Sequence, residues 1–132
     1  YVSLLRSFDE LHITALFSKC KKYFPVFSSC NANFRITARA ETLWCGACPK
    51  CAFVFAALAA HLPKKEVVNI FGANLLANPP LVPLYEALLG IRGVKPFECV
   101  GTPRETKRAF LRIIKRGEYN GDAIILRLKH RI

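Results

Sequence analysis

Methionine is absent from the sequence, at position 1 as elsewhere in its 132 residues. We therefore expect the chain to be a fragment of a longer protein. Long hydrophobic runs are missing too: the longest nearly continuous apolar stretch, residues 51–60, is far shorter than the ~20 residues that span a bilayer. The N-terminal residues lack the basic-then-apolar order of a signal peptide, so we expect a cytoplasmic protein without a membrane span.

Several motifs of known enzyme classes are also missing. The sequence has no glycine-rich phosphate-binding loop, no pyrophosphatase-type Ser-Gly-Gly-x-Asp-Ser loop, no dinucleotide-binding fingerprint and no hydrolase triad. If the parent protein uses a nucleotide, the loop that binds it lies outside this chain. Acidic residues are few, nine against twenty Lys and Arg, and the net charge is +11. This excess predicts an anionic partner, which could be a nucleotide, a phosphorylated metabolite, nucleic acid or a membrane surface.

Apolar residues are plentiful, at 52%, which excludes disorder and suffices for the core of a single domain over residues 1–132. Helical spacing or helix boundary signals predict helices over 2–17, 49–61, 64–70, 83–89 and 102–116. Residues 34–40 alternate loosely and predict a short strand or a loop. The tail from Ala123 alternates apolar and basic residues, which predicts an edge strand or a frayed end. The expected class is mainly α with minor β.

Two helices have the clearest boundaries. Thr102-Pro103-Arg104-Glu105 combines a capping box with proline at the first helical position, and Gly117 should end that helix. The helix over 49–61 is apolar nearly all round, which is typical of a helix buried on several sides.

Three cysteines within seven residues, Cys45, Cys48 and Cys51, form the most informative motif. The C-x2-C-x2-C spacing lets tight turns bring the sulfurs onto one ion, whereas cysteines this close cannot easily pair as disulfides. A reduced metal site is therefore favoured. Cys30, in a loop rich in turn formers, is the best candidate for the fourth ligand, and the alternatives, in order, are Cys20, His61 and His12.

Four thiolates would form a closed structural zinc site, so zinc is the expected ion. An iron–sulfur cluster is the alternative, because the same spacing with one remote cysteine also suits four irons.

Three basic residues have two interpretations each. Arg104 and Lys107, near a helix N-terminus, could hold a phosphate or carboxylate, or could simply belong to a solvated helix face. Lys50, between two expected ligands, is a surface lysine or an anion contact beside the metal loop. Cys99 on its own would be a small buried hydrophobe.

Several strings together resemble one enzyme family. They are Ser-Cys-Asn-Ala-Asn-Phe at 29–34, Leu-Trp-Cys-Gly-Ala-Cys-Pro-Lys-Cys-Ala-Phe-Val-Phe at 43–55, Phe-Gly-Ala-Asn-Leu-Leu at 71–76 and Lys-Pro-Phe-Glu-Cys-Val-Gly at 95–101. Over residues 28–110 the chain is similar to the C-terminal part of the MurL family, the UDP-N-acetylmuramoyl-L-alanyl-L-glutamate epimerases of bacterial peptidoglycan synthesis. The four cysteines also resemble the zinc site of the pyrophosphatase-type enzyme that makes the queuosine precursor.

The resemblance implies a reaction for the full-length protein, which would join this small helical domain to an N-terminal, ATP-pyrophosphatase-like α/β domain. With ATP and magnesium, the enzyme would adenylate the α-carboxylate of the terminal L-Glu, remove the acidified Cα proton and return it on the other face. In the family-like string, Glu98 and Cys99 are the expected proton-transfer or substrate-contact residues.

The expected ligand of this part of the protein is therefore a UDP-linked muramoyl dipeptide, contacted by Lys50, Lys95, Arg104 and Lys107. The metal bound by Cys30, Cys45, Cys48 and Cys51 would be scaffold, and this chain alone would be inactive. Two other interpretations stay open at this point. One is a small basic zinc module that binds nucleic acid, and the other is a structural zinc domain that docks onto its own N-terminal half.

Overall fold

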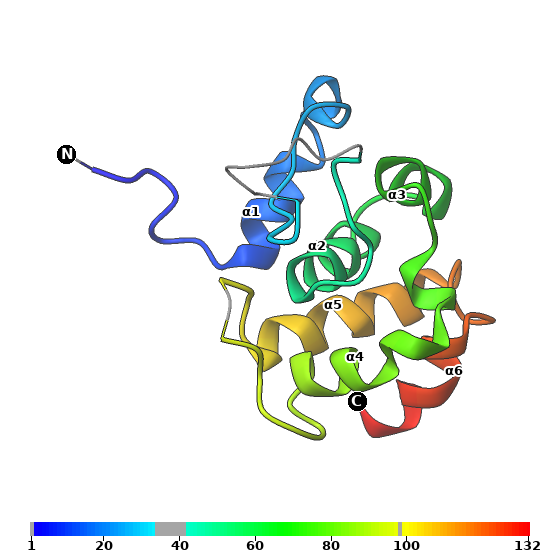
Figure 1. Ribbon diagram of the computed structural model, residues 1–132. Helices are drawn as coiled ribbons and strands as arrows, with labels where there is room; N and C mark the ends of the chain where they lie inside the picture. Colours follow the sequence, from blue (N-terminus) through cyan, green and yellow to red (C-terminus); the bar gives the residue numbers. More distant parts are fainter. Residues whose placement is uncertain (1, 34–41, 98) are drawn as a thin grey trace.

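The computed structural model describes residues 2–33, 42–97 and 99–132 and is mainly helical. The described residues form six α-helices and contain no strand, and short 3-10 turns lie between α1 and α2, between α3 and α4, and after α6. The expected strand or loop over 34–40 lies outside the described residues. The helices are α1 (Glu10–Phe17), α2 (Pro49–Ala59), α3 (Lys64–Phe71), α4 (Val82–Leu88), α5 (Pro103–Arg116) and α6 (Ala123–Leu128), arranged as in Figure 1.

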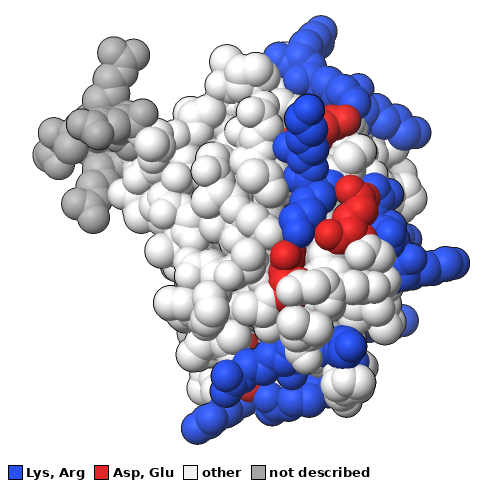
Figure 2. Space-filling view, turned by 90° about the vertical axis from the view of Figure 1, so that its right-hand side faces the viewer, with Lys and Arg blue, Asp and Glu red and all other residues white. Residues whose placement is uncertain are grey.

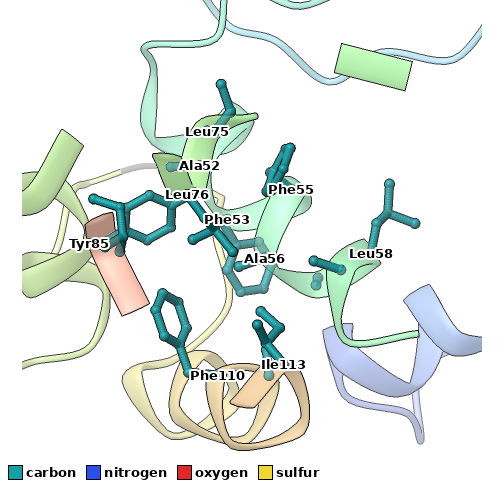
Figure 3. Packing of buried hydrophobic residues seen from close by; sticks show 14 of the residues in the cluster. Ala52, Phe53, Phe55, Ala56, Leu58, Leu75, Leu76, Tyr85, Phe110 and Ile113 are labelled. Atoms are coloured by element: carbon teal, nitrogen blue, oxygen red, sulfur yellow. The ribbon is translucent and has the colours of Figure 1, made fainter. Parts of the chain in front are cut away.

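Helix α2 lies at the centre of the molecule and contacts α1, α3, α4 and α5. Eight of its eleven residues are buried, which confirms the helix predicted to be buried on several sides. Phe110 and Ile113 of α5 point toward α2, and Tyr85 of α4 lies against the same core (Figure 3). Because α2 begins at Pro49, within the cysteine motif, with Cys48 as its N-cap and Cys51 in its first turn, the core fixes the position of these two thiols.

The α5 boundaries are those predicted from the sequence. Thr102 and Glu105 form a reciprocal capping box, and Gly117 closes the helix in the left-handed region at φ 83°. The second Glu105 carboxylate oxygen accepts a 2.7 Å hydrogen bond from the backbone N–H of Glu10, the first residue of α1. One buried carboxylate therefore caps the N-termini of two helices and ties α1 to α5.

The first predicted helix begins later than expected. Asp9 caps α1 by accepting a 2.7 Å hydrogen bond from the His12 N–H, so the helix starts at Glu10 and not near Val2. The stretch before Asp9 extends away from the helical body (Figure 1), and Val2 and Leu4 are 86% and 89% exposed. Apolar spacing alone does not make a helix where there is no surface to bury it.

The C-terminal tail was also predicted wrongly: residues 123–128 form helix α6 and not an edge strand or a frayed end. Ile124, Ile125 and Leu128 are fully buried, and the spacing i, i+1, i+4 puts all three on one helix face. Helix α6 packs against α4, so burial of this face overrides the alternation of apolar and basic residues.

A candidate metal centre and the cavity beside it

The thiols of Cys30, Cys45, Cys48 and Cys51 converge on one point. Their four Sγ atoms all lie within 4.8 Å of one another. Three of the separations are 3.9 Å between Cys30 and Cys48, 3.8 Å between Cys45 and Cys51, and 3.4 Å between Cys48 and Cys51. The cysteine preferred from the sequence as the fourth member of the cluster, Cys30, is the one that joins the other three.

Backbone N–H groups orient the sulfurs. Cys45 N donates to Cys30 Sγ at 3.4 Å, Ala47 N to Cys45 Sγ at 3.5 Å, and Cys51 N to Cys48 Sγ at 3.4 Å. Between them, Gly46 has φ 71°, a conformation that a residue with a Cβ rarely adopts. Cys48 is the N-cap of α2. Its sulfur therefore also gives a partner to the Cys51 N–H, which has no acceptor within the helix.

These contacts set the acidity of the thiols. Burial raises the pKa of Cys30, but the backbone N–H groups of Cys45 and Asn33 outweigh it and bring that pKa down to about 7. Burial, followed by the neighbouring Cys48, raises the pKa of Cys51, and burial raises that of Cys45. Four thiols this close cannot all ionise without a cation among them, since each new thiolate would face the others.

The donor set therefore fits a metal ion. Four sulfurs at ~2.3 Å from a tetrahedral ion are separated by about 3.8 Å. The Cys30–Cys48 and Cys45–Cys51 separations, 3.9 and 3.8 Å, match this value, and the Cys48–Cys51 separation of 3.4 Å is shorter. Two of the four cysteines, Cys30 and Cys51, are fully buried, so the site is closed to solvent on that side. A closed set of four protein ligands is typical of a structural site and leaves no position for a substrate.

The alternative ligands lie outside this cluster. Among the described residues the group of metal-ligating side chains is limited to the four cysteines and includes none of Cys20, His12 and His61. Cys20 and Cys99 are both exposed. The interpretation of Cys99 as a small buried hydrophobe is therefore wrong.

A cavity of about 650 Å³ adjoins the cysteine loop. It is lined by Asn31, Lys50, Val94, Lys95, Pro96, Phe97 and Cys99. Asn31 follows Cys30, and Lys50 lies between Cys48 and Cys51, so two wall residues are next to expected metal ligands. The structure thus brings Lys50 together with Lys95 and Cys99, residues 45 or more positions away along the chain.

The cavity combines positive charge with apolar surface. Within the described part of the chain, neither Lys50 nor Lys95 takes part in an ion pair. Val94 is 82% exposed and the Phe97 ring is fully exposed, so the apolar wall faces solvent. An anionic molecule with an apolar or sugar-like portion is the ligand that such a wall suits.

A tight contact fixes the downstream end of the 95–101 segment. A Cβ atom added to Gly101 would lie 2.4 Å from the Phe53 ring of α2 and 3.2 Å from the Glu105 carboxylate. Only glycine permits this approach, so the segment is anchored to the same helix that begins at the cysteines.

The other predicted site residues lie elsewhere. Arg104 and Lys107, on the first turns of α5, do not line the cavity. Glu98 lies outside the described residues. Sequence reasoning missed Asn31, Val94, Pro96 and Phe97 as cavity residues, although all but Val94 stand in the family-like strings.

A sequence model of the MurL C-terminal domain matches residues 26–132 of this chain. The chain belongs to the MurL C-terminal domain family. The family resemblance predicted from the cysteine and Lys95 strings is thereby confirmed, and the match covers all four clustered cysteines as well as the cavity.

Curated relatives agree with the MurL assignment. The chain is 48% identical over 128 residues to a UDP-N-acetyl-alpha-D-muramoyl-L-alanyl-L-glutamate epimerase of Xanthomonas oryzae pv. oryzae, with 96% of this chain and 28% of the relative covered. A protein of the same name from a Micromonospora species is 46% identical over 127 residues, with the same coverage. The chain thus spans little more than a quarter of the length of these relatives. No solved structure matches it.

Helices of the length and apolar character needed to cross a bilayer are not found in the described part of the chain.

Proposed function

We propose that this chain is the C-terminal part of an ATP-dependent epimerase that converts the terminal L-Glu of UDP-MurNAc-L-Ala-L-Glu to D-Glu in the cytoplasm. The observation that carries the proposal is the 46–48% identity, over 96% of the chain, to proteins named as this epimerase. In the relatives, most of the length lies outside the matched region. An ATP-binding domain in the remainder of the parent protein would supply the nucleotide loop that this sequence lacks.

The cavity beside the cysteine loop is the proposed substrate site. Lys50 and Lys95 would hold anionic groups of the UDP-linked dipeptide, since both ammonium groups lack an ion-pair partner within the described residues. Cys99, exposed in the same cavity, would transfer a proton at Cα together with Glu98. Adenylation of the α-carboxylate by ATP and magnesium would acidify that proton. Arg104 and Lys107 would contact substrate only from outside this cavity.

Zinc is the ion that we propose for the four cysteines. The separations near 3.8 Å suit one mononuclear ion, whereas cysteines of an iron–sulfur cluster bind different irons and stand farther apart. Bound zinc would join the Cys30 loop to the start of α2 and so hold Asn31 and Lys50 in the cavity wall. The ion itself would take no part in the epimerisation, which would depend on the side chains of the cavity.

The full-length parent protein tests the proposal. It should form D-Glu from the UDP-linked dipeptide in the presence of ATP, and this chain alone should not. Lys95→Gln should raise KM about tenfold, and Cys99→Ala or Glu98→Gln should lower kcat by about a hundredfold, with metal content unchanged. Lys65→Gln, an exposed lysine on α3 away from the cavity, is the matched control.

Two results would contradict the proposal at different points. If the full-length protein does not epimerise the dipeptide, the function is wrong. If it does, but the Lys95, Cys99 and Glu98 variants match Lys65→Gln, the function stands and the cavity is not the site. The family match does not favour the alternative hypothesis of a small basic zinc module that binds nucleic acid. A salt-dependent mobility shift with oligonucleotides would be evidence for that alternative.

A further inference from the structure

A second hollow lies between α1 and α5 and shares no lining residue with the cavity beside the cysteines. It measures about 160 Å³ and is lined by Leu11, His12, Ala15, Arg108 and Arg112. Leu11 and Ala15 are one turn apart on α1, as Arg108 and Arg112 are on α5, so each helix forms one wall. The α1 wall is apolar apart from His12, and the α5 wall carries two guanidinium groups.

Both guanidinium groups are held in place by a neighbour. Arg108 Nη1 lies 2.5 Å from Asp9 Oδ2, and Arg112 Nη1 lies 3.3 Å from His61 Nε2. Each contact engages one terminal nitrogen of a group that has five N–H donors in a planar fork. The remaining donors are therefore pre-oriented, which lowers the entropic cost of binding an oxyanion.

The hollow has a surplus of positive charge. Asp9 neutralises Arg108, but Arg112 takes part in no ion pair within the described residues, and its partner His61 accepts from it as a neutral ring. His12, which is exposed, lines the hollow from the α1 side. On the face of the molecule in Figure 2, Lys and Arg side chains gather toward one side, and much of the rest of that face carries few charges.

The volume limits what the hollow can hold. A water molecule occupies about 30 Å³ in the liquid, so the space corresponds to about five waters. A phosphate group has a comparable number of heavy atoms, whereas a nucleoside is too large. We propose that the hollow between α1 and α5 binds a phosphate group, either as the free ion or at the end of a larger molecule. The site is independent of the epimerase function proposed above.

Titration of the metal-loaded protein with inorganic phosphate, followed by ¹⁵N–¹H NMR at constant ionic strength, tests the site. Shifts should be confined to amides of residues 9–15, 61 and 105–115. Arg112→Gln should weaken the phosphate Kd about tenfold, because it removes a charge-assisted contact. Ala15→Glu should abolish binding, because it puts a carboxylate into the hollow without altering the arginines.

Lys115→Gln is the matched control, since Lys115 is an exposed cation on α5 that does not line the hollow. It should leave the Kd within about twofold. Equal loss in Lys115→Gln and Arg112→Gln, or phosphate binding that survives Ala15→Glu, would overturn the site. Glycerol 2-phosphate distinguishes the sources: binding at least as tight as phosphate indicates a phosphomonoester ligand, and binding of phosphate alone indicates the free ion.

Discussion

His61 shows how a single residue couples two helices to the pH dependence of folding. It follows α2, and its Nε2 accepts a 3.3 Å hydrogen bond from Arg112 of α5. Burial, followed by the positive charge of Arg112, lowers the pKa of His61 below 6.5, and a hydrogen bond with the backbone of Leu11 opposes this only in part. The folded state therefore favours the neutral ring, while the unfolded chain has an ordinary histidine.

This difference in the pKa of His61 between the folded and unfolded states predicts that the protein becomes less stable at acidic pH. Because the folded pKa of His61 is the lower one, the unfolded state binds more protons as pH falls below about 6.5, and the free energy of unfolding decreases from there toward the folded pKa. Above that range His61 contributes no pH dependence. NMR titration of the His61 ring should give a pKa below 6.5, and Arg112→Gln should raise it. An unchanged pKa in that variant, or equal shifts in Lys115→Gln, would contradict the assignment.

At the scale of the element, α6 is the clearest case of tertiary packing that overrides local pattern. Its sequence alternates like an edge strand, yet Ile124, Ile125 and Leu128 face the core as a helix. Ile125→Ala should lower the free energy of unfolding by about 3 kcal/mol, because it opens a cavity in a fully buried site.

The next residue, Leu126, serves as the control for that measurement. It is 51% exposed, so Leu126→Ala should cost less than about 1 kcal/mol. Chemical denaturation of both variants decides the matter. If both variants lose the same free energy of unfolding, or if Leu126→Ala loses more, the helix face that carries Ile125 is not the buried one.

The elements that the sequence predicted well are those whose signals are local. Thr102, Glu105 and Gly117 specify the ends of α5 by their own chemistry, and Pro49 with its apolar neighbours specifies α2. The lack of helix before Asp9 and the helical state of 123–128 depend on whether distant residues supply a surface to pack against, which spacing does not reveal. For the same reason the cysteine cluster was predictable, while the cavity that joins Lys50 to Val94 and Phe97 was not.

At the scale of the whole molecule, one helix links the metal centre to the proposed substrate site. Helix α2 carries Cys51 and Lys50 in its first turn and is capped by Cys48, and its Phe53 packs against Gly101 at the end of the cavity segment. The cluster also ties Cys30 and its neighbour Asn31 to this end of α2. Loss of the ion should therefore disorder the cavity as well as the cysteine loop.

Metal content is the measurement that tests this account most directly. We expect the purified protein to contain about one zinc per chain and no labile sulfide. Cys51→Ser should lose the zinc and unfold at a much lower temperature, whereas Cys20→Ser, whose thiol is exposed and outside the cluster, should keep both the zinc and the melting temperature. A brown protein with iron and labile sulfide, or a Cys51→Ser variant as stable as the wild type, would contradict it.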